Sequence, residues 1–268
     1  MVIPKITPQS LCELKRQGEK VALLTAYDYP TALIEDSLGI EIILVGDSFG
    51  MTVLGYDSTL KVGMQEMLMA CGAVGRAVKR AMIVADMPFM SYQSSNSAAI
   101  KNAGKFVASA NADGVKVEGA GTTLERIKAI IGAGIPVMGH IGFTPQSLKK
   151  FGTYKVVGKI DTEEKQLIED AKALEKVGVF SIIVECVSSK IIKEIKKAVK
   201  IPIYGIGAGA DCDGQILVVN DILGLFQGKL PKYVKKYADL TPVIEKAIKE
   251  YISDVKNNKY PDEEHTYR

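Results

Sequence analysis

Short apolar runs alternate with longer amphipathic segments along most of the chain. The apolar runs are rich in β-branched residues and are bounded by glycine and proline, which is typical of strands buried on both faces of a parallel sheet. There are eight of them: VALLTA from Val21, IEIILVGDS from Ile40, AMIVADMP from Ala81, DGVKVEGA from Asp113, IPVMGHIG from Ile135, FSIIVECV from Phe180, IPIYGIGA from Ile201 and GQILVVNDILG from Gly214. The alternation predicts repeated strand–helix units.

The segments between the runs carry apolar residues at the spacing of three and four that predicts helices. We expect helices at Gln65–Lys79, Thr122–Ile131, Thr162–Val177 and Ser188–Val199, and two more near the ends, at Pro8–Arg16 and Thr241–Val255. Thr122 followed by Glu125 matches a capping box. Gly132, Gly134 and Gly178 stand where such helices should stop.

Eight units without an interrupting linker favour a single (β/α)8 TIM-barrel domain over residues 1–268. Such a barrel needs about 250 residues, and the chain has 268. The Pro8–Arg16 helix is expected to cap the bottom of the barrel, and the polar residues after Val255 to form an extra C-terminal segment that frays. An open, doubly wound sheet is the competing architecture.

Composition and charge narrow the class of protein. Hydrophobic residues make up 47% and charged residues 24%, as in soluble globular proteins. The net charge of +3 gives no argument for nucleic acid or a membrane surface as a partner. The first residues, MVIPKITPQS, lack the apolar core of a signal peptide, so the cytoplasm is expected. The four cysteines lack C-x-x-C spacing, so neither a zinc site nor a disulfide framework is indicated.

Two loops that follow predicted strands are unusually long, at Ser48–Gly63 and Phe143–Lys159. Long loops in a compact domain are usually lids or binding loops. Loops that follow the strands of a barrel lie on its catalytic face. A substrate site is therefore expected beneath these two loops.

Polar residues interrupt the apolar runs near the carboxyl ends of consecutive predicted strands. They are Asp47 and Ser48 on the second strand, Asp86 on the third, Lys116 and Glu118 on the fourth, His140 on the fifth and Glu185 on the sixth. A buried charge is costly unless it is paired or metal-bound. Each one alone could be a satisfied structural group, but a row of them at one end of a barrel predicts a site.

The residue types indicate what this site could hold. Two aspartates and a glutamate form a hard oxygen site, which suits Mg²⁺ better than zinc. Lys116 and Glu118 are two residues apart and point to the same side of a strand, either as an internal ion pair or as a carboxylate-binding lysine beside a cation-supporting glutamate. A lone histidine such as His140 is more often structural than catalytic, and His265 in the tail is expected to be exposed. The glycines of Gly205–Gly209 match a phosphate loop only weakly.

The sequence resembles the ketopantoate hydroxymethyltransferase (3-methyl-2-oxobutanoate hydroxymethyltransferase) family. The matching stretches are LTAYDYPTA, VGDSFGMTVLGYDST, VADMPFMSY, DGVKVEG, MGHIGFTPQS, YKVVGK, VECV, IPIYGIGAGADCDGQILV and YPDEEHTYR. The resemblance runs from about residue 5 to the end. Small departures from the family pattern, at Phe143, Thr153 and Asn220, miss the candidate catalytic positions. The match of the polar tail weakens the expectation that it frays.

The resemblance implies a role for each strand-end residue. Asp47 and Asp86 would ligate Mg²⁺, or Mn²⁺ or Co²⁺, with Glu118 near the metal. Ser48 and Lys116 would bind the 2-oxoacid together with the metal-binding aspartates, His140 would be an auxiliary contact, and Glu185 would be the general acid/base. The resemblance further implies 5,10-methylenetetrahydrofolate as the one-carbon donor and a homodecamer.

Two alternative functions stay open at the level of sequence. One is a metal-dependent lyase of the phosphoenolpyruvate mutase and isocitrate lyase type, whose members typically carry a cysteine in the substrate loop; Ser48–Gly63 has none. The other is a non-catalytic barrel that acts as a scaffold or binding subunit. A scaffold would have no need for aligned acidic residues at strand ends.

Overall fold

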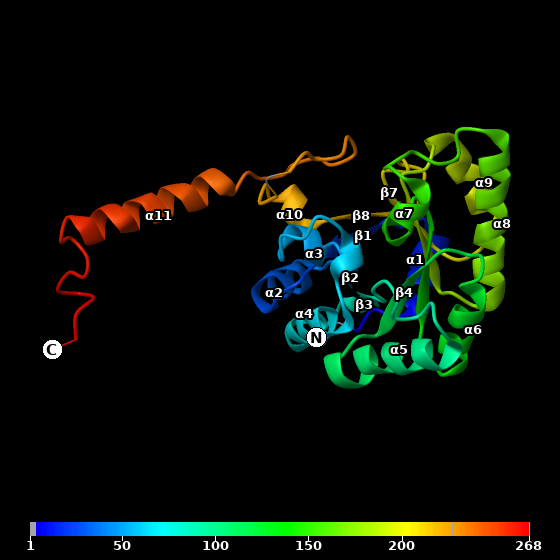
Figure 1. Cartoon of the computed structure of the whole chain (residues 1–268), viewed down its shortest axis with the longest axis horizontal. Helices are drawn as coiled ribbons and strands as arrows, with labels where there is room; N and C mark the ends of the chain where they lie inside the picture. Colours follow the sequence, from blue (N-terminus) through cyan, green and yellow to red (C-terminus); the bar gives the residue numbers. More distant parts are fainter. Residues whose placement is uncertain (1–3, 227, 268) are drawn as a thin grey trace. The chain divides into compact units, whose positions relative to one another are not determined.

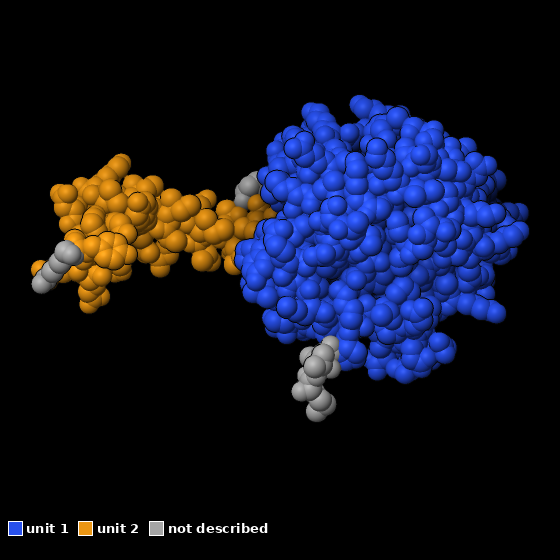
Figure 2. All heavy atoms as spheres, turned by 90° about the horizontal axis from the view of Figure 1, so that it is seen from below, with its two compact units in different colours: residues 1–218 blue, residues 219–268 orange. Residues whose placement is uncertain are grey.

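The computed structural model describes residues 4–226 and 228–267 and divides the chain into two compact units, residues 1–218 and residues 219–268 (Figure 2). The single domain expected over residues 1–268 stays a prediction. The core cluster of buried residues runs from Leu11 to Ile216, so it lies entirely within the first unit.

Eight parallel strands close into a barrel in the first unit (Figure 1). They are β1 (Val21–Thr25), β2 (Ile42–Val45), β3 (Met82–Asp86), β4 (Gly114–Glu118), β5 (Val137–Gly142), β6 (Ser181–Glu185), β7 (Ile203–Ile206) and β8 (Gly214–Leu217). Each strand pairs with its neighbours in sequence, and β8 closes the circle by pairing with β1, Val21 opposite Gly214. The barrel is confirmed and the open sheet is excluded.

Helices follow most of the strands. In the first unit they are α1 (Pro8–Gln17), α2 (Tyr29–Leu38), α3 (Phe49–Thr52), α4 (Met64–Ala77), α5 (Asn96–Ala110), α6 (Leu124–Gly132), α7 (Leu148–Phe151), α8 (Asp161–Val177) and α9 (Ile192–Ala198). Three short 3-10 helices accompany them, η1 (Thr59–Lys61), η2 (Pro145–Ser147) and η3 (Ser189–Ile191). All six predicted helices are present within a few residues of their expected bounds, counting α11 (Thr241–Lys256) of the second unit.

Local hydrogen bonds explain two helices that the apolar pattern did not predict. In α2, the side chain of Asp28 accepts from the backbone of Thr31 at 2.9 Å, and Gly39 ends the helix in the left-handed conformation. In α5, Ser95 accepts from the backbone of Ala98 in the same way. The capping box predicted at Thr122 is absent, because α6 begins after Thr123, whose side chain makes no capping bond.

The helix α1 closes the bottom of the barrel, as predicted. Leu11 is fully buried in the core cluster, which includes Tyr204 of β7 and Met82 of β3. Lys15 Nζ donates to the carbonyl of Ile201 at 2.6 Å and lies 3.1 Å from Asp213 Oδ2. These contacts join α1 to the loops at the amino ends of the strands, so the opposite end stays open to loops that follow the strands.

A buried carboxyl group on α2 is unusual for a barrel exterior. Glu35 is 5% exposed, and neither of its carboxyl oxygens has a hydrogen-bond partner among the described residues. Burial, with a contribution from the charge of Asp28, raises the pKa of Glu35 to about 8. The folded chain therefore holds this proton more tightly than the unfolded chain does.

We expect Glu35→Gln to remove a pH dependence of stability. Because the folded pKa is raised from 4.5 to about 8, the free energy of unfolding of the wild type should fall as pH rises through that window, by roughly 2–4 kcal/mol. The glutamine side chain of the variant stays neutral at every pH. The difference in melting temperature between variant and wild type should therefore grow between pH 5 and pH 8, by several degrees. A constant difference would contradict the buried carboxyl, and Glu13→Gln, an exposed position, is the control.

The second unit contains α10 (Val219–Ile222) and α11 (Thr241–Lys256). The last apolar run therefore becomes a strand followed by a helical turn. Thr241 Oγ1 donates to the carbonyl of Gly224 at 2.7 Å. No residue of α11 is buried, and its apolar side chains are exposed, among them Val243, Ile248 and Ile252.

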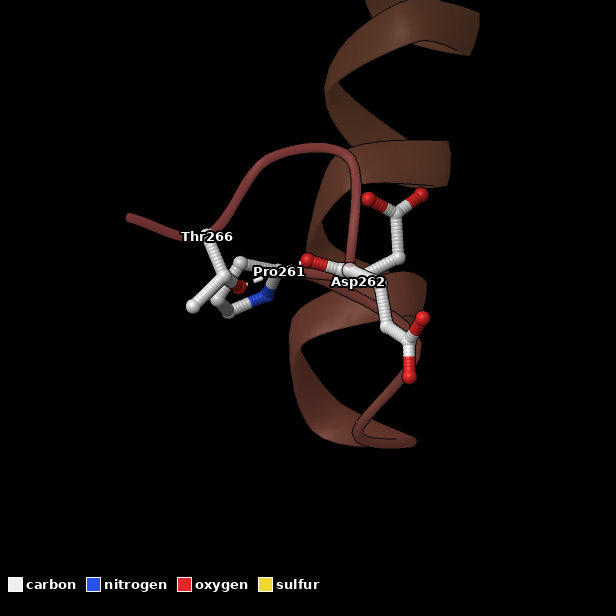
Figure 3. Close-up of a pocket in the computed structure, with 4 residues that line it drawn as sticks. Pro261, Asp262 and Thr266 are labelled. Carbon is white, nitrogen blue, oxygen red and sulfur yellow. Dashed lines mark hydrogen bonds between the residues drawn. The ribbon is translucent and has the colours of Figure 1, made fainter. Parts of the chain in front are cut away.

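The C-terminal tail makes local contacts of its own. His265 Nδ1 lies 2.6 Å from Asp262 Oδ1, and Tyr260 packs against His265 with ring centroids 5.8 Å apart. His265 is exposed, as predicted. Figure 3 shows a small open pocket here, lined by Pro261, Asp262, Glu263 and Thr266. It includes none of the strand-end residues that the sequence singles out.

Candidate active site

The candidate residues lie at one end of the barrel. Asp86 and Glu185 are the last residues of β3 and β6, Glu118 is the last of β4, and Asp47 follows β2 by two residues. His140 lies on β5 opposite Glu118 in the strand register. Since all eight strands are parallel, these carboxyl ends meet on the face where barrel enzymes bind substrate.

Lys116 forms the centre of the site. Its Nζ lies 2.9 Å from Asp86 Oδ1, 3.2 Å from His140 Nδ1 and 3.8 Å from Glu118 Oε1, and the side chain is almost fully buried. Burial lowers the pKa of Lys116, but the charges of Asp86, Glu118 and Asp47 outweigh it and raise the pKa above its ordinary value. The ammonium group is therefore charged at neutral pH and pairs with carboxylates from two strands.

His140 joins the lysine to the last candidate, Glu185. Its Nδ1 lies 3.4 Å from Glu118 Oε1 and its Nε2 lies 3.3 Å from Glu185 Oε2. Burial and the charge of Lys116 lower the pKa of His140, yet its bonds to Glu118 and Glu185 raise it overall. Burial raises the pKa of Glu118, but His140, Lys116 and the backbone of Gln146 lower it overall. Alternating acids and bases thus run unbroken from Asp86 to Glu185.

Asp47 and Asp86 form a buried pair of carboxylates beside this chain. The backbone N–H of Asp47 donates to Asp86 Oδ2 at 2.9 Å, and both residues are under 5% exposed. Burial raises the pKa of Asp47, and the charges of Asp86 and Glu118 add to the effect. Burial also raises the pKa of Asp86, although Lys116 opposes it. A divalent cation bound to two buried carboxylates would neutralise their negative charge, and carboxylate oxygens are ligands that Mg²⁺ accepts.

Glu118 is committed to neighbouring side chains and backbone rather than to this pair. Its Oε2 accepts the backbone N–H of Gln146 at 3.0 Å, and its Oε1 faces Lys116 and His140. Within residues 4–226 and 228–267, no three acidic, histidine or cysteine side chains are gathered as a set that could hold a metal ion. The two aspartates therefore fit a cation that takes its remaining ligands from substrate or water.

Ser48 borders the pair on the side of β1. Its Oγ lies 2.8 Å from the Tyr27 hydroxyl, and the residue is half-buried. Gly46 leaves room for the Ser48 side chain, because a Cβ at position 46 would stand 2.9 Å from Ser48 Oγ. Ser48 thus presents a positioned hydroxyl next to Asp47.

Sequence reasoning missed Gln146 and Tyr92, which complete the site. Gln146 lies in η2 and is 6% exposed, and its side chain donates to Asp47 Oδ2 at 3.0 Å. The hydroxyl of Tyr92 donates to Gln146 Oε1 at 2.8 Å. Neither residue interrupts a strand, so neither has the polar strand-end pattern that marked the other candidates. Both do lie in stretches that carry the resemblance.

The two long loops lie on the same face as the site. The first contains α3 and η1, the second contains η2 and α7, and η1 contacts η2. An isolated parallel β-bridge between Val157 and Val187 joins the second loop to the segment just after Glu185. Gly209 of the Gly205–Gly209 run has a packing explanation, since a Cβ at this position would stand 2.6 Å from the Cβ of Ser189.

Comparison with known proteins identifies the family. The family model for ketopantoate hydroxymethyltransferase matches residues 5–263. The chain belongs to this family. It is 50% identical over 263 residues to 3-methyl-2-oxobutanoate hydroxymethyltransferase of Carboxydothermus hydrogenoformans, covering 98% of this chain and 95% of the relative. The enzyme of that name from Clostridium botulinum (strain Langeland) is 51% identical over 262 residues, with the same coverage. The predicted family membership and the one-carbon transferase class are confirmed.

Solved structures with the same fold come from more distant enzymes. A phosphonopyruvate hydrolase in complex with oxalate and Mg²⁺ superposes with a TM-score of 0.60 at 12% identity, covering 96% of this chain and 92% of the other. A 2,3-dimethylmalate lyase of the PEP mutase/isocitrate lyase superfamily gives 0.60 at 15% identity, covering 97% and 91%. At such identities the likeness shows only a shared barrel fold. Membership of the hydroxymethyltransferase family is shown by the family model and by relatives that are about 50% identical over nearly the whole chain.

Proposed function

We propose that this member of the ketopantoate hydroxymethyltransferase family transfers a hydroxymethyl group from 5,10-methylenetetrahydrofolate to 3-methyl-2-oxobutanoate. The products are 2-dehydropantoate and tetrahydrofolate, as pantothenate biosynthesis requires, and one water supplies the hydroxyl oxygen. The observation that carries the proposal is the buried Asp47–Asp86 pair joined through Lys116 and His140 to Glu185.

In this proposal Asp47 and Asp86 would hold Mg²⁺. Glu118, which pairs with Lys116, would lie near the metal. When bound, it supplies Lewis acidity toward the oxygens of a 2-oxoacid and so makes the C3 proton easier to remove. Carboxylate oxygens also accept Mn²⁺ and Co²⁺, so the proposal covers those ions. Burial raises the pKa of both aspartates, and a cation at this position would offset the cost of their buried charge.

The side chains divide the remaining work. Lys116 neutralises the substrate carboxylate and fixes its orientation, and Ser48 offers a hydroxyl to the same group. Glu185 takes the C3 proton as the base, and the resulting carbanionic carbon forms the new bond to the one-carbon unit. The two bonds from that unit to folate nitrogens break, water supplies its hydroxyl, and the protons from C3 and from water end on those nitrogens. His140, whose Nε2 lies 3.3 Å from Glu185 Oε2, orients that carboxylate toward C3. Because Glu185 is separate from the metal ligands, its lone pairs stay available for the proton.

One assay tests this function directly. The purified chain is incubated with 3-methyl-2-oxobutanoate, Mg²⁺ and 5,10-methylenetetrahydrofolate, and 2-dehydropantoate is measured. We expect product only when all three are present. Cleavage of 2,3-dimethylmalate without folate would instead favour the lyase, and absence of both reactions would favour a non-catalytic barrel.

The remaining partner and location expectations stay predictions. The described residues include no helix that is both long and apolar enough to cross a membrane, and the cytoplasm stays a prediction. The homodecamer implied by the resemblance also stays a prediction, and the exposed apolar side chains of α11 are compatible with association. The absence of nucleic-acid partners rests on the small net charge.

A further inference from the structure

The amide of Gln146 makes contacts that span several strand ends. Its Nε2 donates to Asp47 Oδ2 at 3.0 Å and to the carbonyl of Met87 at 2.9 Å, while its Oε1 accepts the Tyr92 hydroxyl at 2.8 Å. Its backbone N–H donates to Glu118 Oε2 at 3.0 Å. One buried residue of the second loop is thus bonded to residues that follow β2 and β3 and to the end of β4.

These bonds fix the orientation of the amide. Both protons of the –NH₂ group are used on acceptors, and the carbonyl oxygen faces a hydroxyl donor. A flipped amide would place its oxygen against Asp47 Oδ2 and the Met87 carbonyl, which would leave two buried acceptors without a donor. The amide therefore has one favourable orientation, which the Met87 carbonyl selects because it can only accept, and the Tyr92 hydroxyl bonds the amide oxygen and holds it in place.

The fixed amide in turn orients a carboxylate. Asp47 is held through its backbone N–H by Asp86 and through Oδ2 by Gln146. The hydrogen bond on Oδ2 leaves the carboxylate with lone pairs that would ligate a cation, and it fixes the orientation in which they are offered. Residues that hydrogen-bond a metal ligand commonly set its geometry, and their loss typically weakens metal binding about 10–100-fold.

We propose that Gln146 is a positioning residue that orients Asp47 for a divalent cation and thereby couples cation binding to the order of the loop at residues 143–159. The inference rests on the metal site of the proposed function. Coupling is reciprocal, because a contact that makes the cation bind better must make the bound cation stabilise the loop. A residue that only anchored the loop would change loop order without changing cation affinity.

The test uses the full chain and Mn²⁺ alone, without substrates. Binding is measured from the loss of the free Mn²⁺ signal in electron paramagnetic resonance, and loop order from amide hydrogen exchange of residues 143–159 with and without Mn²⁺. Gln146→Met keeps the length of the side chain and removes both donors. Tyr92→Phe leaves the donors but removes the hydroxyl that bonds the amide oxygen and holds the amide in place. Gln166→Met, on the exposed face of α8, is the matched control.

We expect Mn²⁺ to bind Gln146→Met about 10–100-fold more weakly than the wild type, and Tyr92→Phe with an intermediate loss. Mn²⁺ should slow exchange in the loop of the wild type and of Gln166→Met, and this protection should be lost in Gln146→Met. If Gln146→Met does not fold, Tyr92→Phe decides the matter. Unchanged affinity in the folded variants would overturn the positioning role.

A different result would identify a failure of the underlying metal site. If the wild type bound no Mn²⁺, or if Asp47→Asn bound it as well as the wild type, both the metal ligands and the role of Gln146 would be overturned. Binding that depends on Asp47 but not on Gln146 or Tyr92 would overturn only the role of Gln146.

Discussion

Glu185→Gln should still bind 3-methyl-2-oxobutanoate but should lose the exchange of its C3 proton with solvent deuterium. The amide has the same shape as the carboxylate and cannot accept the proton. A positioned base contributes about 10²–10⁴-fold to such a step, so exchange and overall turnover should both fall by that factor. Proton NMR in D₂O follows the exchange without any folate, which isolates the proton transfer from the later carbon–carbon bond.

The position of Glu185 explains why the loss should be specific. Its carboxylate lies 3.3 Å from His140 Nε2 and is not part of the Asp47–Asp86 pair, so binding of the metal and oxoacid should change little. Glu169→Gln, on the exposed face of α8, is the control. Normal exchange in Glu185→Gln would show that another group is the base, and His140 would then be the next to test.

Removal of either proposed metal ligand, Asp47 or Asp86, should abolish metal-dependent turnover while the chain still folds. A metal that polarises a carbonyl contributes several kcal/mol to the stabilisation of developing charge, and each of Asp47→Ala and Asp86→Ala deletes one of its two proposed protein ligands. Turnover measured across a range of Mg²⁺ concentrations should therefore stay at background. Retained metal-dependent activity in either variant would refute the assignment.

Thermal unfolding provides a second, independent reading of the same site. Burial and mutual repulsion raise the pKa of Asp47, which means that its ionised form costs the folded state free energy. Asp47→Asn should therefore melt at the same temperature as the wild type without metal, or higher, in line with the common trade between activity and stability. Asp161→Asn, an exposed substitution on α8, is the control for the turnover measurements on the Asp47 and Asp86 variants. Large destabilisation of Asp47→Asn would indicate a structural role instead.

Much of the fold could be predicted because, in parallel β/α proteins, the order of apolar runs along the chain follows the order of the strands. Strands buried on both faces must be apolar throughout, so all eight were visible. The helix α5 was less visible, since NSAAIKNAGKFVASA is built largely of small residues with weak apolar contrast. The end of β8 was misjudged because Val219 continues an apolar run while its backbone already turns into α10.

The candidate site was partly predictable for a related reason. Asp47, Asp86, Glu118 and Glu185 interrupt or end apolar runs at the same end of parallel strands, so topology alone brings them together. Gln146 could not be found in this way. Its contacts join positions 99 and 28 residues away, and a loop residue carries no periodic signal of what it will reach.

The sequence by itself determined the barrel, the end at which chemistry would gather and, through its resemblance, the family. Those conclusions depend on patterns within each strand and on the order of strands, which are local properties of the chain. Only the tertiary structure decided which acid pairs with which base: Lys116 with Asp86, His140 between Glu118 and Glu185, and Gln146 against Asp47. Such pairings depend on side-chain distances across a closed barrel, and closure brings together atoms whose separation along the chain says nothing of their separation in space.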